Sequence, residues 1–411
     1  MGTGALLNGH RARYRFAHPP HSPSGCAARL PGPSGSGYPA PTTPEVFAVL
    51  RLPAALRLPA ALRLPAAMMR RSDRPTLIVA LSLACLIALA SACTDTVDGG
   101  ADSGAGAAAY PFDDVLRLNH IQVKGTHNSY HLRPDLDIPD WRYSHVSLDV
   151  QLGDQGVRQF ELDAHWHAEV GAYRVYHVLE IDQRSTCDRF VDCLAVLESW
   201  STAHPGHLPI VVMTEMKDIL ADLPLADPLG QLETELISVW PRQRILTPDD
   251  LRGSHATVMD ALAADGWPTL AAVRGKLIVS LLLEDAPRSE YSHGDLHLHD
   301  RLCFVMAPAG SPYGAIIKVD DPVGGKAAIA SAVAAGALVR TRADAGGKEP
   351  SPDDTARQQA ALASGAHMLS SDYPAAVSEG GYFLDLPGGQ PARCNPLTAP
   401  PECTAAALES L

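Results

Sequence analysis

The chain has 411 residues, of which 46% are hydrophobic, and its formal charge at pH 7 is −13. This length allows one large domain or two medium ones, with a sizeable buried core. Residues 1–75 hold ten arginines, no lysine and two acidic residues, a charge of +8 that leaves −21 for the rest of the chain. So acidic a body argues against a nucleic-acid partner and against simple adsorption to an anionic membrane, whereas a bound metal cation would relieve part of the field.

Residues 1–67 are dominated by Ala, Pro, Gly and Arg, and Leu-Arg-Leu-Pro-Ala-Ala recurs between Leu50 and Ala67. Prolines at this spacing prevent a continuous helix and remove hydrogen-bond donors from any sheet. We interpret the segment either as a disordered tail or as upstream sequence translated from a misassigned start codon. We favour the second interpretation, because an export signal with its own methionines follows.

Residues 68–93 have the pattern of a signal peptide. Two methionines and two arginines open it, an apolar run covers Leu77 to Ala90, and small residues suited to cleavage follow. The apolar run is short for a membrane span. Because Cys93 comes next, Leu89-Ala90-Ser91-Ala92-Cys93 resembles a bacterial lipoprotein box. We therefore expect export without a transmembrane domain in the mature chain, with lipid attached at Cys93; plain secretion is the alternative.

Residues 94–110, rich in Gly, Ala, Asp and Ser, are expected to form a flexible tether, and residues 111–411 one globular domain. Strands are predicted at Ile121–Thr126, Val157–Asp163, Tyr173–His177, Leu208–Met213, Lys276–Leu283, Leu302–Met306, Ala337–Thr341 and Ala366–Ser371. Helices are predicted at Arg189–Ala203, Leu229–Trp240, Val323–Ala335 and Asp353–Ser364. Most of the predicted strands are near-continuous apolar runs, which are typical of strands buried on both faces.

Eight strands with intervening helices predict an α/β fold, a (β/α)8 TIM-type barrel that can be irregular. Between the second and third strands there is little room for a helix, so a loop or hairpin-like connection is expected there. An open doubly wound sheet is the rival fold, but no Gly-rich phosphate loop follows the first strand. Residues Tyr382–Leu411 are expected to pack on the surface as a tail, and the protein is expected to be a monomer.

Polar residues that carry chemistry gather at the ends of four predicted strands. In a barrel these ends converge on one site. The amide and carboxylates there supply hard oxygen ligands, which suit Ca²⁺ or Mg²⁺ rather than zinc; they are Asn128, Glu161, Asp163 and Glu215. Two residues apart on one strand, Glu161 and Asp163 share a face. The alternative for each carboxylate taken singly is an ordinary salt bridge with Arg or Lys.

Two histidines, His127 and His177, end different predicted strands beside these carboxylates. Histidines placed so can act as base and acid on opposite sides of a phosphorus atom, although a lone histidine is more often a structural hydrogen-bonding group. Lys217 alternates onto the same face as Glu215, where its charge suits a phosphate oxygen; a solvated loop lysine is the alternative. We interpret His165 and His167, placed beyond the second strand, and His293 to His299 as polar surface rather than a second metal site.

Cysteine spacing is informative in an exported protein. Cys187 with Cys193, and Cys394 with Cys403, are spaced for local disulfides, although connectivity stays open from sequence alone. Cys303 stands alone in an apolar run, which favours a buried thiol. A zinc site is the weaker interpretation, because no cysteine pair has zinc-finger spacing beside a partner pair.

Residues Leu118 to Pro374 resemble the phosphatidylinositol-specific phospholipase C superfamily, in particular its bacterial, secreted, calcium-dependent branch. The motifs that carry the resemblance are Lys124-Gly125-Thr126-His127-Asn128-Ser129-Tyr130, Glu161-Leu162-Asp163, Val175-Tyr176-His177, Thr214-Glu215-Met216-Lys217, Val339-Arg340-Thr341-Arg342-Ala343-Asp344 and Leu369-Ser370-Ser371-Asp372-Tyr373-Pro374. The resemblance implies that His127 is the general base and His177 the second catalytic histidine. It also implies calcium ligands at Asn128, Glu161, Asp163 and Glu215, and we expect Lys217 and Arg340 to bind substrate.

The resemblance implies calcium-dependent cleavage of phosphatidylinositol-type lipids at a membrane surface, giving diacylglycerol and a cyclic or open inositol phosphate. The predicted strand Gly275–Leu283 is apolar at its carboxyl end, which argues against head groups with several ring phosphates. A glycerophosphodiester phosphodiesterase is the first alternative. That family shares the barrel and the Glu-x-Asp and Glu-x-Lys motifs but usually has Arg where this chain has Asn128. A surface lipoprotein that binds inositol or sugars without turnover is the second.

Overall fold

The computed structural model describes residues 110–308, 310–344, 354–376, 381–388 and 391–409. The predicted extension, signal peptide, lipidation at Cys93 and tether fall on residues 1–109 and lie outside the described residues. Within the described part of the chain, no helix combines the length and the apolar character needed to cross a membrane.

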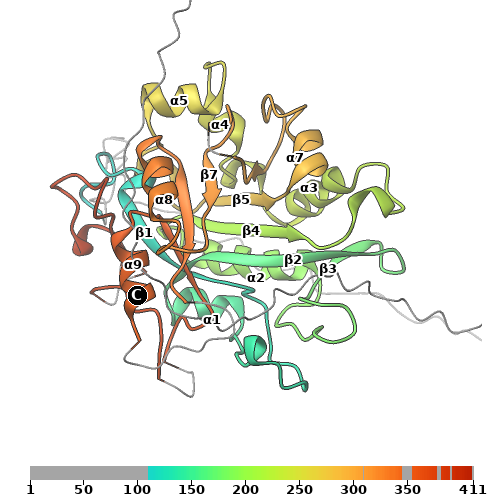
Figure 1. Cartoon of the computed structure of the whole chain (residues 1–411). Helices are drawn as coiled ribbons and strands as arrows, with labels where there is room; N and C mark the ends of the chain where they lie inside the picture. Colours follow the sequence, from blue (N-terminus) through green and yellow to red (C-terminus); the bar gives the residue numbers. More distant parts are fainter. Residues whose placement is uncertain (1–109, 309, 345–353, 377–380, 389–390, 410–411) are drawn as a thin grey trace, which may run out of the picture. The chain divides into compact units, whose positions relative to one another are not determined.

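Eight parallel strands form the centre of the fold, in the order β6-β5-β4-β2-β1-β9-β8-β7. Figure 1 labels β1, β2, β4, β5 and β7 among them. Their bounds are β1 Ile121–Thr126, β2 Val157–His167, β4 Ile210–Met216, β5 Leu277–Leu282, β6 Phe304–Val305, β7 Ile316–Lys318, β8 Leu338–Arg342 and β9 Met368–Ser371. The sheet curls into a nearly closed barrel whose two end strands are β6 and β7. The predicted TIM-type barrel, with its allowance for irregularity, is confirmed.

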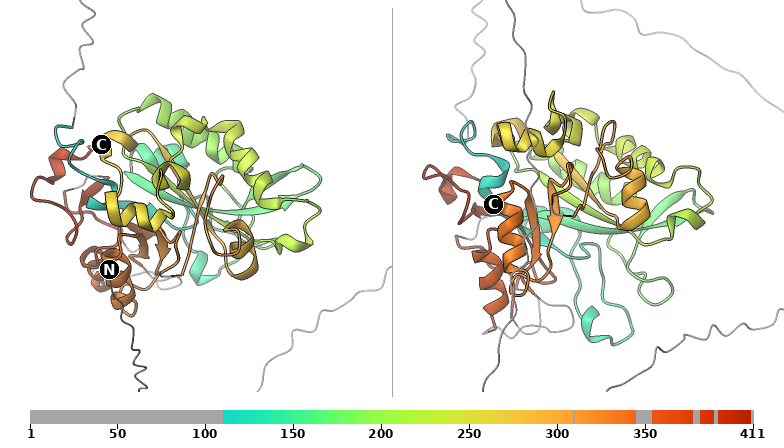
Figure 2. Two further views of the ribbon diagram at one scale, coloured as in Figure 1. Left: turned by 90° about the horizontal axis from the view of Figure 1, so that it is seen from above. Right: turned by 45° about the horizontal axis from the view of Figure 1, so that its top comes forward.

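Helices surround these strands, as the two further views in Figure 2 show. Their bounds are α1 Leu148–Gly153, α2 Phe190–Ala203, α3 Pro228–Val239, α4 Pro248–Arg252, α5 Val258–Asp265, α6 Leu270–Val273, α7 Asp285–Tyr291, α8 Lys326–Ala334 and α9 Ala356–Ala363. The two late helices, α8 and α9, both contact β8 and are the orange helices of Figures 1 and 2. Because helices cover the barrel wall, residues of β4 and β5 are buried on both faces, as parallel strands require.

One of the eight predicted strands does not belong to the barrel. The segment predicted as Tyr173–His177 forms β3, Ala172–Val175, which runs antiparallel to the end of β2 (Figure 1). β2 is longer than predicted, so His165 and His167 lie inside it, and placing them beyond the strand end was wrong. The eighth barrel strand is instead β7, which was not predicted; it has three residues, of which only Ile316 and Ile317 are apolar.

The C-terminal segment is part of the core rather than a surface tail. Strand β10, Ala392–Cys394, pairs antiparallel with the first half of β1. Near the end of the chain Glu409, 7% exposed, forms a buried ion pair with Arg158, which is 1% exposed. Glu409 Oε2 also accepts a hydrogen bond from the Leu208 backbone at 2.7 Å. The segment therefore joins the starts of three barrel strands, and the prediction of a peripheral tail was wrong.

The cysteines pair locally. The structure joins Cys187 to Cys193 and Cys394 to Cys403, and it buries the thiol of Cys303. The first disulfide ties the start of α2 to the loop before it, and the second closes the segment that follows β10. Each bridge therefore fixes a connection beside the barrel rather than linking distant parts of it.

Replacing Glu409 with Ala is expected to destabilise the whole barrel. The change leaves the Arg158 guanidinium buried without its carboxylate, and breaking such a pair costs about 3 kcal/mol or more. The free energy of unfolding in urea measures the effect. Asp137→Ala is the matched control, because the Asp137–Arg142 pair is exposed and should contribute little. Equal stability of the two variants would contradict a structural role for the C-terminal segment.

Candidate active site

Two hydrogen bonds of the buried Ser129 join the chain after β1 to β2. The Glu161 backbone N–H donates to Ser129 Oγ at 2.8 Å, and the Ser129 N–H donates to the Glu161 carbonyl at 2.9 Å. Asn128, between these contacts and the strand, adopts a left-handed backbone with φ of 43°, a conformation that Asn tolerates better than most residues. A Cβ at Gly125 would lie 2.1 Å from Gln159 Oε1, so a larger residue there would force the buried Gln159 side chain to shift. The chain after β1 is thereby turned sharply at the barrel mouth.

Three carboxylates meet beside this turn. The parallel register of β2 and β4 places Asp163 directly opposite Glu215, and Glu161 lies two residues earlier on the same face of β2. One oxygen from each of the three lies within 4.8 Å of the other two. Glu161 and Asp163 are each 1% exposed, whereas Glu215 borders the solvent. Like charges directly opposite each other on neighbouring strands are unfavourable unless a cation is shared among them.

Two basic side chains form ion pairs with the carboxylates. Lys217 Nζ is 3.0 Å from Glu215 Oε1 and 3.2 Å from Asp163 Oδ2. Arg340 Nη2 is 2.5 Å from Glu161 Oε2 and also donates to Ser370 Oγ at 3.0 Å. The ordinary salt bridges considered as the alternative to a metal site are therefore present. They leave three buried or half-buried negative charges against two positive ones.

Asp163 is the least satisfied of the three carboxylates. Among the described residues, neither of its oxygens accepts a hydrogen bond of good geometry, although the Lys217 ammonium is near one of them. Burial and then the Glu215 carboxylate raise the pKa of Asp163 to about 7, against the opposing effect of Lys217. A buried acid whose oxygens accept no well-formed hydrogen bond among the described residues, next to two further carboxylates, fits a divalent cation with oxygen ligands, as Ca²⁺ and Mg²⁺ have. The residues present therefore fit the predicted metal.

His127, directly after β1, is held by a carboxylate and an arginine. Its Nδ1 lies 2.8 Å from Asp372 Oδ1, and the second oxygen of Asp372 accepts from Arg342 Nη2 at 2.5 Å. Arg342 is held in turn by Asp344, with 2.8 Å between Nη2 and Oδ1. Burial and then the Arg342 charge keep the pKa of His127 well below its ordinary value of 6.5. The ring is therefore neutral at physiological pH, with Nε2 the nitrogen it can present to a substrate.

His177 has a different environment. Its Nδ1 lies 2.9 Å from Asp182 Oδ2, and the same oxygen is 3.0 Å from Nε2 of the fully buried His131. Burial raises the pKa of Asp182, but hydrogen bonds from His131 and His177 outweigh it and lower that pKa below the ordinary 3.8. Asp182 is therefore an ionised carboxylate in contact with His177. The edge of the Trp141 ring system packs against the imidazole, with ring centroids 5.1 Å apart.

The β2–β3 hairpin explains how His177 reaches the barrel mouth although β3 is not a barrel strand. Val175 pairs with Ala164, so the chain returns along β2 and His177, two residues later, comes back toward the level of the carboxylates. Both histidines lie within electrostatic range of the cluster. The charge of Glu161 acts on His127, and the charge of His177 acts on Asp163.

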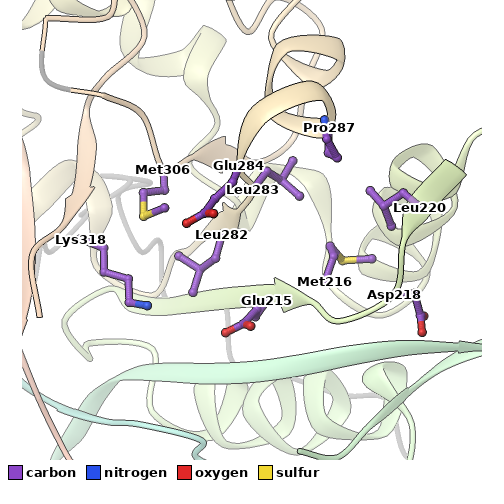
Figure 3. A pocket seen from close by; sticks show the side chains of 10 residues that line it. All are labelled: Glu215, Met216, Asp218, Leu220, Leu282, Leu283, Glu284, Pro287, Met306 and Lys318. Atoms are coloured by element: carbon purple, nitrogen blue, oxygen red, sulfur yellow. The ribbon is translucent and has the colours of Figure 1, made fainter. Parts of the chain in front are cut away.

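A cavity of about 340 Å³ opens beside Glu215 (Figure 3). Glu284 and Lys318 face it from the ends of β5 and β7, and Met306 lies between them after β6. A second hollow of about 470 Å³ shares Glu284, Met306 and Lys318 with the first. The cavity therefore extends from the carboxylates toward the place where the barrel wall ends at β6 and β7.

The structure brings most of the predicted site residues together. Glu161, Asp163 and Glu215 meet, and Lys217 and Arg340 contact them. The Asn128 side chain is 3% exposed, and its role as a metal ligand stays a prediction. Arg340 is fully buried against Glu161 and Asp320, and its contact with substrate also stays a prediction.

Sequence reasoning missed the two carboxylates that hold the histidines. Asp372 directly follows β9, in the motif Leu369–Pro374, whose resemblance to the family implies no role for this residue. Asp182 lies in the loop after β3, where no strand end or spacing marks it. His165 and His167, considered as surface histidines, contact Tyr176 instead, through its backbone carbonyl at 3.1 Å and its hydroxyl at 3.0 Å.

Comparison with known proteins gives one family. The model of the family described as "Phosphoinositide phospholipase C, Ca2+-dependent" matches residues 116–175 and 171–396. The fold is similar to that of a calcium-dependent phosphoinositol-specific phospholipase C from a Gram-negative Pseudomonas species, with a TM-score of 0.50 and 18% identity over 70% of this chain and 99% of that one. A Ca²⁺-dependent phosphatidylinositol-specific phospholipase C from Streptomyces antibioticus gives a TM-score of 0.48 and 20% identity over 63% of this chain and 95% of that one. No curated protein sequence matches the chain.

The raised pKa of Asp163 predicts a pH effect on stability. The folded-state pKa of about 7 lies above the ordinary 3.8, so the protonated acid stabilises the fold at low pH and this contribution is lost as pH rises toward 7. Thermal unfolding of metal-stripped protein should therefore show the wild type losing stability relative to Asp163→Asn between pH 4 and 7. Calcium should remove the loss, because a cation favours the ionised acid. Parallel pH profiles for the two metal-stripped proteins would contradict the assignment.

Proposed function

We propose that the protein cleaves phosphatidylinositol-type lipids with calcium. The chain belongs to the Ca²⁺-dependent phosphoinositide phospholipase C family and is a phosphodiesterase of the phospholipase C type. The products are diacylglycerol and an inositol phosphate, cyclic in the first step. The reaction uses the two histidines as general base and general acid.

The observation that carries the proposal is the unequal environment of the two histidines. The carboxylate on His127, Asp372, is shared with the permanent positive charge of Arg342, which disfavours a proton on the imidazole. The carboxylate on His177, Asp182, is ionised and is shared with a second imidazole, that of His131. This difference in the partners of the two carboxylates supports His127 as the general base and leaves the role of general acid to His177.

In the first step His127 Nε2 takes the proton from the inositol hydroxyl next to the phosphate, and that oxygen attacks the phosphorus. The bond between phosphorus and the diacylglycerol oxygen breaks, and His177 donates its proton to the leaving oxygen. In a second step the roles are reversed: His177 takes a proton from water, and His127 returns its proton to the ring oxygen as the cyclic phosphate opens. Each proton transfer therefore uses a histidine whose Nδ1 contacts a carboxylate.

Glu161, Asp163 and Glu215 would hold the calcium ion, joined by Asn128 from the turn after β1. When bound, the ion offsets the negative charge that develops on the phosphoryl oxygens. Lys217 adds a positive charge at the same edge of the site. The two basic side chains near the cluster differ in solvent exposure: Arg340 is fully buried, and Lys217 is about one-fifth exposed.

The cavity supports a head group without additional ring phosphates. Its lining holds three acidic side chains, Glu215, Asp218 and Glu284, against the single cation of Lys318. A polyol ring that carries only hydroxyl groups can hydrogen-bond with such a lining, whereas further phosphates would be repelled. Phosphatidylinositol is therefore the lipid class that the site favours.

Substitution of the two histidines tests the proposal. His127→Ala and His177→Ala should each lower turnover of phosphatidylinositol by about 10²-fold or more, the usual contribution of a general acid or base. On a nitrophenyl inositol phosphate, whose leaving group needs no proton, His177→Ala should recover much of its loss and His127→Ala should not. His293→Ala, in an exposed loop, is the control and should be unaffected.

The pattern of rescue decides the roles. Equal rescue of both variants on the activated substrate would mean that the two roles are misassigned. Rescue of His127→Ala alone would mean that they are exchanged. Wild-type rates in either variant on the lipid would contradict the acid–base assignment.

A further inference from the structure

Lys217 lies where a cation shared by Asp163 and Glu215 would be attracted. Its ammonium contacts one oxygen of each, at 3.2 and 3.0 Å. Its backbone N–H donates to the Ala164 carbonyl at 3.0 Å, which fixes the start of the side chain beside β2. The cluster therefore contains a tethered positive charge that belongs to the protein.

The two cations on the cluster are not equivalent. Arg340 has no exposed surface, and Glu161, Asp320 and Ser370 engage its guanidinium, so it cannot leave without breaking a buried network. Lys217 is 22% exposed, and its partner Glu215 is 36% exposed and borders the cavity. A lysine side chain is flexible and carries a compact charge that water solvates well. Lys217 can therefore swing away from the carboxylates at little cost.

A calcium ion and the Lys217 ammonium would use the same oxygens. Ca²⁺ binds carboxylate oxygens at about 2.3–2.6 Å. With the ammonium 3.0–3.2 Å from oxygens of Asp163 and Glu215, an ion on those oxygens would lie within about 6 Å of it. At this separation two positive charges repel each other strongly in a partly buried site. Full occupancy by calcium and the present position of Lys217 therefore oppose each other.

We propose that Lys217 is an internal competitor of calcium. Its ammonium balances Asp163 and Glu215 in the metal-free protein, and it leaves these carboxylates when calcium binds. The released ammonium then faces the cavity beside Glu215, where it is available to a substrate phosphate; this last step rests on the proposed function, whereas the competition itself does not. The lysine thus couples loading of the metal to readiness of the site for an anionic substrate.

Calcium affinity of the metal-stripped protein, measured by isothermal titration calorimetry with calcium alone, tests the competition. Lys217→Met and Lys217→Gln remove the charge and should bind calcium at least tenfold more tightly than the wild type. Lys217→Arg keeps a positive charge and should bind no more tightly than the wild type. Lys276→Met makes the same change in net charge at the start of β5, where Lys276 Nζ contacts the Gln243 carbonyl, and should leave the affinity within about twofold.

Unchanged or weaker calcium binding in both neutral Lys217 variants would overturn the proposal, since the lysine would then not compete. Tighter binding in Lys276→Met of equal size would also overturn it, because the effect would be one of net charge. The Gln variant keeps a polar end that can hydrogen-bond with the carboxylates, so a folded neutral variant is available if the Met variant is unstable. A wild type that binds no calcium would contradict the metal role in the proposed function. A neutral Lys217 variant that binds calcium more tightly but no longer cleaves lipid would support the competition, because only the substrate role of Lys217 depends on the proposed function.

Discussion

The site depends on three carboxylates being held together against their mutual repulsion. The register of two parallel strands places Asp163 opposite Glu215, and strand alternation adds Glu161 to the same face. Glu161 and Asp163 cannot move far, because both are almost fully buried. The protein offsets the repulsion in two ways: Arg340 is fixed on Glu161, and Lys217 is placed on the other two. One negative charge remains uncompensated in this cluster, and a divalent cation is the ligand that such an excess attracts.

The same logic separates the two histidines. Each has a carboxylate on Nδ1, so hydrogen bonding alone would make them alike. What differs is the second partner of each carboxylate, since Asp372 is neutralised by Arg342 while Asp182 is shared with His131. We propose that this difference, a charge one contact away from the ring, is what makes His127 the general base and His177 the general acid. The barrel contributes by bringing together chain ends that are far apart in sequence, such as His127 and Asp372.

Much of this arrangement follows from local sequence. The strand predicted at Ile121–Thr126 has the bounds of β1, and the alternation of Glu161 and Asp163 predicted their common face, because both depend only on neighbouring residues. Long-range features did not follow in the same way. The three residues of β7 form a strand only because β8 pairs with them. The C-terminal segment belongs to the core only because its strand β10 pairs with β1 and its Glu409 pairs with Arg158. Asp182 was missed for a similar reason, since its significance comes from the folding back of the β2–β3 hairpin.

The central claim, a calcium-dependent phospholipase C that acts on phosphatidylinositol, is tested most directly by the products of a mixed phospholipid vesicle. Mass spectrometry after incubation with the protein should show diacylglycerol and inositol phosphate, formed from phosphatidylinositol alone, when calcium is present. With calcium removed by a chelator these products should be absent, and they should return when calcium is restored. Full product formation in excess chelator would contradict the role of the carboxylate cluster, and release of a free alcohol with phosphate left on the lipid would contradict the phospholipase C reaction.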